Sequence, residues 1–172
     1  MKSALACIVI GSVITLSVKA ETTAKISDVH LCCQSCVKGV EKAVADVKDV
    51  TATVDKDAGT VTLAGPDKAT VQKAANALAA AGYFGTSSDA AIKLPNDTGA
   101  KGTKVQTLKL EGVHLCCGKC VSAVDKAVKS VPGVKEHNAK KNTESFEVTG
   151  DFNDGEVLEA LQKAGLTGKV AK

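Results

Sequence analysis

The chain is a mid-sized globular sequence with little net charge. It has 172 residues, of which 44% are hydrophobic and 24% charged, and a formal net charge of +3 at pH 7. This length accommodates two small domains or one of medium size. Every basic residue is Lys, Trp is absent, and the other aromatics are one Tyr and three Phe. Nucleic-acid recognition by Arg forks or stacked rings is therefore excluded.

Residues 1–20 have the pattern of a secretory signal peptide. Lys2 precedes an apolar stretch at 4–18, and Val18-Lys19-Ala20 is a small-residue pattern typical of a cleavage site. The stretch is short for a membrane span. We therefore expect cleavage after Ala20, a periplasmic or secreted mature chain, and no stable membrane insertion after cleavage.

The next 74 residues, 21–94, predict one small unit that mixes strands and helices. Alternating residues indicate strands, apolar residues every three to four positions indicate helices, and Asp57-Ala58-Gly59 is a hairpin turn. Asp67 is placed to cap the second helix, and Gly82 to end it. The expected order is strand, helix, strand, strand, helix and strand, at 25–31, 34–47, 50–54, 60–63, 67–81 and 91–94.

The unit is repeated later in the chain. A shift of 84 positions superposes Asp28–Val37 on Gly112–Val121, so that the motif His-Leu-Cys-Cys-Xaa-Xaa-Cys occurs at His30–Cys36 and again at His114–Cys120. The expected strands of the second unit lie near 105–113, 134–138, 145–148 and 168–171, and its helices near 119–130 and 154–164. His137 has no counterpart in the first unit and is expected at the surface.

The fold class that follows is α+β. We expect two tandem ferredoxin-like βαββαβ domains, 21–94 and 104–172, each a four-stranded antiparallel sheet with two helices on one face. Residues 95–103 are rich in turn formers and have no apolar period, so they are interpreted as a flexible linker. The two units would then move independently or close on each other.

The repeated motif carries the chemistry. Cysteines at the start of a helix have their thiolate form favoured by the helix dipole, and soft sulfur selects Cu(I), Zn(II) or related ions over Mg or Ca. Two thiolates suit linear Cu(I) or Hg(II), a third permits trigonal binding or a shared cluster, and structural zinc needs four ligands. The candidate ligands are Cys32, Cys33, Cys36, Cys116, Cys117 and Cys120, with His30 and His114 as further candidates.

Both units resemble heavy-metal-associated domains, the soft-metal modules of copper chaperones, metal-pumping ATPases and periplasmic mercury-binding proteins. Leu31–Cys36 and Leu115–Cys120 stand in place of the Met-Xaa-Cys-Xaa-Xaa-Cys loop of that family. The resemblance implies that the ligand pairs are Cys33 with Cys36 and Cys117 with Cys120. It also implies that Leu31 and Leu115 fill a buried position, and that Tyr83, or Leu166 in the second unit, packs near the loop.

The sequence departs from the family pattern at Cys32, Cys116, His30 and His114, which could enlarge the ligand set. We expect a non-enzymatic protein that sequesters or transfers a soft metal, with Cu(I) favoured and Zn(II) or Hg(II) as alternatives. Its partner would be a metal-donating or metal-accepting protein, and a metal-bridged dimer is possible. Two other functions stay open: a thiol-disulfide oxidoreductase, and a small interaction protein stapled by disulfides.

Overall fold

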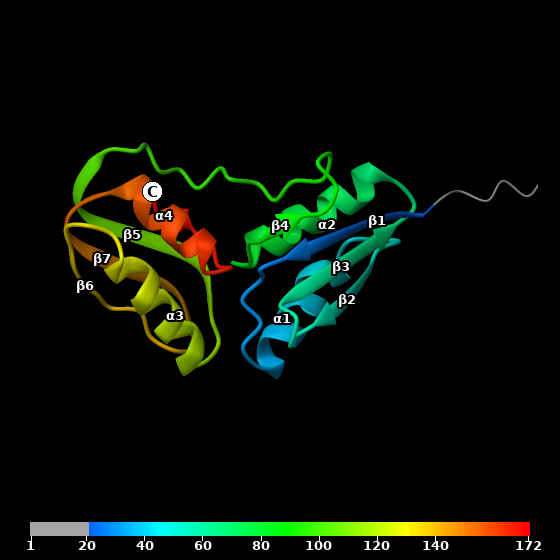
Figure 1. Cartoon of the computed structure of the whole chain (residues 1–172), viewed down its shortest axis with the longest axis horizontal. Helices are drawn as coiled ribbons and strands as arrows, with labels where there is room; N and C mark the ends of the chain where they lie inside the picture. Colours follow the sequence, from blue (N-terminus) through cyan, green and yellow to red (C-terminus); the bar gives the residue numbers. More distant parts are fainter. Residues whose placement is uncertain (1–20) are drawn as a thin grey trace, which may run out of the picture.

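The computed structural model describes residues 21–172, and the predicted signal peptide with Cys7 lies outside them. Two units of mixed α/β structure lie side by side and are joined by a segment that runs along both (Figure 1). No helix within 21–172 is long and apolar enough to cross a membrane.

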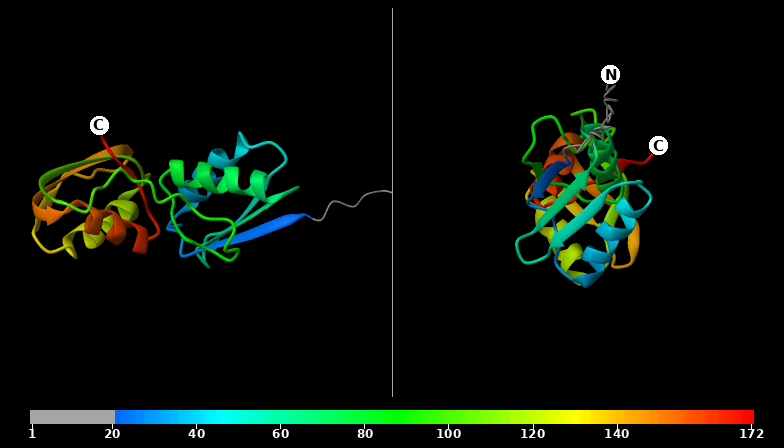
Figure 2. Two further views of the ribbon diagram at one scale, coloured as in Figure 1. Left: turned by 90° about the horizontal axis from the view of Figure 1, so that it is seen from above. Right: turned by 90° about the vertical axis from the view of Figure 1, so that its right-hand side faces the viewer.

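The first unit is a four-stranded antiparallel sheet with strand order β2-β3-β1-β4. Helices α1 and α2 lie on one face of this sheet (Figure 2), and the core forms between the two layers. In chain order its elements are β1 (Thr22–Ser27), α1 (Gln34–Ala45), β2 (Thr51–Asp55), β3 (Thr60–Gly65), α2 (Lys68–Ala80) and β4 (Thr86–Ser87).

The second unit repeats this plan with strand order β6-β7-β5-β8 and with α3 and α4 on one face. Its elements are β5 (Lys104–Leu115), α3 (Gly118–Lys129), β6 (Val134–His137), β7 (Thr143–Asn153), α4 (Asp154–Lys163) and β8 (Lys169–Val170). The predicted fold class, two ferredoxin-like βαββαβ units, is confirmed.

The strand before each cysteine motif ends differently in the two units. Asp28 has a left-handed φ of +63°, and β1 stops one residue earlier at Ser27. Gly112, at the equivalent position, has a φ of +70°. There β5 continues to Leu115 with a register shift after Glu111. The backbone therefore turns before the motif in both units, which directs His30 and His114 toward the space between the units.

The last strand of the first unit is not where the sequence predicted it. Residues 91–94 were expected to form this strand, but β4 is the two-residue segment Thr86–Ser87, paired with β1. Ile92 is fully buried and Leu94 nearly so. Residues 91–94 are therefore part of a loop that covers the core, and their apolar pattern reflects burial and not strand pairing.

The predicted linker, 95–103, forms no helix or strand but is held against the second unit. The Asp154 carboxylate accepts hydrogen bonds from the backbone amides of Lys101 (2.9 Å) and Thr103 (2.8 Å). The buried Thr98 accepts one through its carbonyl from the Val170 amide (2.8 Å). Residues 98–103 are therefore fixed to the second unit, and a shorter part of the linker is free to flex than its composition predicted.

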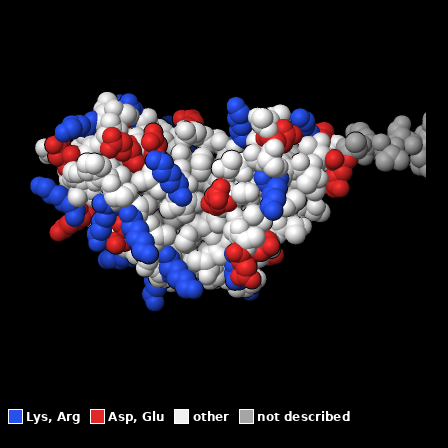
Figure 3. Space-filling model, in the orientation of Figure 1, with Lys and Arg blue, Asp and Glu red and all other residues white. Residues whose placement is uncertain are grey.

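Charges are interspersed over the face drawn in Figure 3, where lysines and acids alternate and several lysines lie over α3.

His137 was expected at the surface, which is wrong for its side chain. That side chain is 9% exposed, and its Nε2 lies 2.9 Å from Asp125 Oδ1. The β6 strand that carries His137 packs along α3, which carries Asp125.

Candidate metal centre

Each cysteine motif wraps the N-terminus of the first helix of its unit. Cys33 and Cys117 are the N-cap residues of α1 and α3, with extended backbones and no side-chain capping bond. Ser or Asp is the usual residue at this position, where its side chain caps the helix. Cys36 and Cys120 lie in the first turn of each helix, and both are fully buried.

The buried position of these two cysteines follows from helical periodicity. Cys36 precedes Val40 and Val44 on the core-facing stripe of α1, and Cys120 stands in the same relation to Val124 and Val128 on α3. Leu31 and Leu115 are also buried, 6% and 2% exposed. The sulfurs of Cys36 and Cys120 therefore sit at the edge of the two cores.

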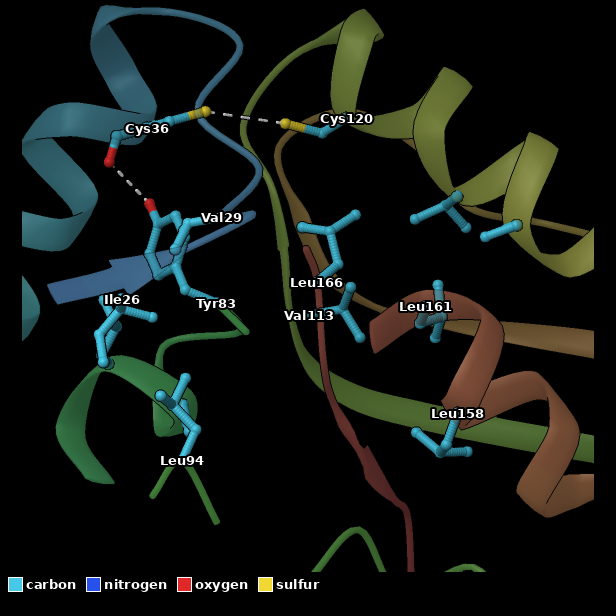
Figure 4. Close-up of a cluster of buried hydrophobic side chains, with 14 of the residues drawn as sticks. Ile26, Val29, Cys36, Tyr83, Leu94, Val113, Cys120, Leu158, Leu161 and Leu166 are labelled. Carbon is cyan, nitrogen blue, oxygen red and sulfur yellow. Dashed lines mark hydrogen bonds between the residues drawn. The ribbon is translucent and has the colours of Figure 1, made fainter. Parts of the chain in front are cut away.

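The two motifs face each other and form a single group of six sulfurs. Figure 4 shows Cys36 and Cys120 pointing toward one another from opposite units, with their sulfurs 4.0 Å apart. Other sulfur pairs across the units are closer: Cys32 with Cys117 (3.5 Å) and Cys120 (3.6 Å), and Cys116 with Cys33 (3.6 Å) and Cys36 (3.6 Å).

Within each motif the sulfur distances are the same in the two units to 0.1 Å. Cys36 lies 3.7 Å from Cys32 and 3.8 Å from Cys33. The corresponding distances from Cys120 are 3.7 Å to Cys116 and 3.9 Å to Cys117. All six thiols are free. The sulfurs of one motif are therefore as close to those of the other unit as to each other.

Two glycines allow this approach. Gly82 follows α2, and a Cβ placed there would lie 2.4 Å from the backbone nitrogen of His114. Gly165 follows α4, and a Cβ there would lie 2.4 Å from the backbone nitrogen of His30. Both have positive φ, +86° and +76°. Each unit thus presents a glycine against the strand end that carries the other unit's cysteines.

Backbone hydrogen bonds join the units at the same place. Tyr83 and Leu166 form an antiparallel bridge. The Gly165 carbonyl accepts from the amides of His30 (3.2 Å) and Phe84 (3.2 Å), and the Gly82 carbonyl accepts from the Thr167 amide (3.0 Å). The interface is nearly two-fold symmetric, because the same segment of each unit makes the contact.

Tyr83 connects the two motifs directly. Its hydroxyl donates to the Cys36 carbonyl (2.9 Å) and lies 3.1 Å from Nε2 of His114, whose ring is 4.5 Å from the Tyr83 ring between centroids. Burial raises the pKa of this phenol, so it stays protonated as a donor. Leu166 occupies the equivalent position in the second unit, and His30 Nε2 is buried with no hydrogen-bond partner among residues 21–172.

The close thiols share their protons unequally. Hydrogen bonding from Cys120 lowers the pKa of Cys36 to about 2, although burial opposes this, while the Cys36 partner and burial raise the pKa of Cys120. Burial and the bond to Cys117 raise the pKa of Cys32 to about 12. Six thiolates cannot all be charged at these separations without a cation between them.

The predicted ligands fall into three overlapping groups with ligand atoms within 4.8 Å of one another. These are Cys36, His114, Cys116 and Cys120; His30, Cys32 and Cys120; and Cys32, Cys33 and Cys117. All eight predicted site residues therefore lie in one region. Sequence reasoning missed that Gly82 and Gly165 bring the loops together, although a glycine after the second helix of both units was the available signal.

Comparison with known proteins gives a family match for the second unit. Residues 107–167 match the family model of the heavy-metal-associated domain. Copper-transporting ATPase 1 of Rhizobium meliloti (strain 1021) is 36% identical over 83 residues, which are 47% of this chain and 9% of that protein. The chain thus corresponds to a small part of that relative.

Two solved structures are similar. The N-terminal domain of PacS from Synechocystis PCC6803 is 26% identical, with a TM-score of 0.36, and the match covers 40% of this chain and 100% of that domain. The N-terminal soluble domains of Bacillus subtilis CopA are 16% identical, with a TM-score of 0.32, over 89% of this chain and 95% of that one.

Proposed function

Because this chain carries a heavy-metal-associated domain, which its second unit matches, we propose that it is an exported carrier that binds a soft metal ion through both cysteine motifs and passes it to a partner protein. The observation that carries the proposal is the group of six free thiols with sulfurs 3.5–4.0 Å apart. Thiolates at such separations repel one another strongly, and a thiophilic cation bound between them removes this repulsion.

Cu(I) is the favoured ion. Soft thiolates select Cu(I), Zn(II) and Hg(II) over harder ions, and the relative from Rhizobium meliloti is named for copper transport. The positive ends of α1 and α3 both point at the sulfurs, which favours the thiolate form of the cysteines. Zn(II) is the main competitor, and Hg(II) the third.

Transfer would proceed by exchange of one thiolate at a time with a donor or acceptor protein. Cys32, Cys33, Cys116 and Cys117 are partly exposed, whereas Cys36 and Cys120 are buried. A partner's thiol can therefore reach the outer four sulfurs first, and the inner two would release the ion last. The proposal is a binding protein with no turnover of its own.

Export is proposed from residues 1–20 and is tested separately. The full chain expressed with its own N-terminus should be recovered from the periplasm beginning at Glu21, as read by N-terminal sequencing. Recovery from the cytoplasm with Met1 retained would refute export while leaving metal binding untouched.

The metal assay uses reduced protein, residues 21–172, loaded without oxygen and dialysed. Elemental analysis should find copper retained, and the Cys36→Ser Cys120→Ser double variant should lose it. The control is Lys38→Ser, a surface substitution on α1 that removes no thiol. Retention of copper by the double variant would refute the assignment of Cys36 and Cys120 as the inner ligands. Turnover of a disulfide substrate by metal-free protein would favour the oxidoreductase.

A further inference from the structure

We propose that the two motifs hold one polynuclear Cu(I)–thiolate cluster of about four ions, shared between the units, in place of one ion per motif. The inference rests on the proposed function, and it concerns how many ions bind and where. It is carried by the pattern in which the six sulfurs contact one another.

The sulfur contacts close into triangles. Each triangle has three sides of 3.5–4.0 Å, and each contains sulfurs from both units. The four triangles are Cys32/Cys36/Cys120, Cys36/Cys116/Cys120, Cys33/Cys36/Cys116 and Cys32/Cys117/Cys120. The 84-residue shift that relates the units exchanges the first with the second and the third with the fourth.

The side lengths fit three-coordinate metal. With a metal–sulfur bond of about 2.3 Å, three sulfurs around one ion lie about 4.0 Å apart, whereas two sulfurs on a linear ion lie about 4.6 Å apart. The pair that the family resemblance assigns to one ion, Cys33 and Cys36, is 3.8 Å apart. That pair is short for a linear site and suits one side of a triangle.

Adjacent triangles share sulfurs, so thiolates would bridge ions. Cys36 and Cys120 each belong to three triangles, Cys32 and Cys116 to two, and Cys33 and Cys117 to one. The most shared sulfurs are the two buried ones. The centre of the cluster would therefore lie where water is excluded, with its outer ions nearer the surface.

Charge also balances better with several ions. Binding exchanges thiol protons for copper, so each ligand thiol releases its proton to solvent and no electron is transferred. About four Cu(I) ions on six thiolates leave a formal charge near −2. The N-termini of α1 and α3 offset about half of this, since each contributes roughly +0.5.

The competing arrangement is a single tetrahedral Zn(II). Cys36, His114, Cys116 and Cys120 have ligand atoms within 4.8 Å of one another, which is a Cys₃His set. It would bind one ion and require His114. The cluster would bind about four and does not require it, so the two arrangements predict different results for a His114→Ala variant.

The test is native mass spectrometry of reduced residues 21–172, titrated with Cu(I) or Zn(II) without oxygen. The expected result is about four copper ions, with partly loaded forms scarce, and a copper–copper distance in the X-ray absorption spectrum. His114→Ala should retain them. Cys33→Ser should lose about one ion because it removes one triangle, and Cys36→Ser about three because it removes three.

A variant that separates the units without touching a thiol completes the test. Gly82→Ala places a Cβ 2.4 Å from the His114 nitrogen. Gly102→Ala also has the strain of a positive φ, but its Cβ would meet no atom of residues 21–172 within 4 Å. Gly82→Ala should bind at most one copper ion per motif and lose the copper–copper distance, and Gly102→Ala should behave as wild type.

The two proposals fail in different ways. Two copper ions bound independently, with the first motif's ion alone lost, and lost equally, by Cys33→Ser or Cys36→Ser, would overturn the shared cluster and leave the carrier function intact. A single Zn(II) that His114→Ala abolishes, in protein that binds about one copper ion, would also overturn the cluster. Absence of any copper binding by reduced wild type would overturn both.

Discussion

Replacing Tyr83 by Phe should loosen the junction between the units. The hydroxyl is fully buried, donates to the Cys36 carbonyl at 2.9 Å, and lies 3.1 Å from His114 Nε2. Phe fills the same space, so only these polar contacts are lost. A hydrogen bond contributes about 1 kcal/mol net, and a buried partner left unpaired costs about 1–3 kcal/mol. We expect the free energy of unfolding to fall by about 2 kcal/mol.

The assay is urea denaturation of reduced, metal-free protein, followed by circular dichroism. A cycle of Tyr83→Phe, His114→Gln and the double variant measures how much of the loss belongs to the contact between the two side chains. We expect a coupling near 1 kcal/mol. A Tyr83→Phe variant within about 0.5 kcal/mol of wild type, with no coupling, would show that the hydroxyl does not hold the units together.

Two further changes test the linker and the covering loop. Burial alone would raise the pKa of Asp154, but backbone amides, those of Lys101 and Thr103 foremost, hold it below its ordinary value. The Asp154 carboxylate therefore stabilises the fold above about pH 4, and this contribution is lost as the pH falls through the lowered pKa. Asp154→Asn should lower the free energy of unfolding by about 2 kcal/mol at pH 7. Chemical denaturation at pH 7 and pH 3 should show this difference shrinking at pH 3, and a constant difference would contradict the reasoning. Ile92→Ala should reduce the free energy of unfolding by about 3 kcal/mol because Ile92 is fully buried, and thermal denaturation should show no comparable loss for Lys93→Ala, an exposed neighbour.

Most of the fold could be predicted because alternation and helical periodicity reflect which side of a strand or helix is buried. The second helix of the first unit illustrates this. Asp67 was expected to cap it, and Asp67 Oδ1 accepts from the Thr70 amide at 2.8 Å. The last strand of that unit was misplaced because two residues, Thr86 and Ser87, carry no period, whereas the buried Ile92 and Leu94 imitate one.

The identity of the candidate ligands could be read from the repeated motif, but their meeting could not. Besides the sulfurs and the Tyr83–His114 pair, the contact between the units is made by main-chain atoms of Gly82 and Gly165 and by the Tyr83 and Leu166 bridge. Main-chain contacts leave no hydrophobic pattern in a sequence. The distance between the motifs therefore had to come from the three-dimensional arrangement.

The covalent link between the two units changes how the thiol group assembles. Two separate copies of one unit would meet at a rate that falls with dilution, and would part when their concentration dropped below the dissociation constant. Residues 95–103 make the encounter intramolecular, at an effective concentration in the millimolar range for a short connection. The six thiols should thus come together within a single molecule even where the protein is scarce.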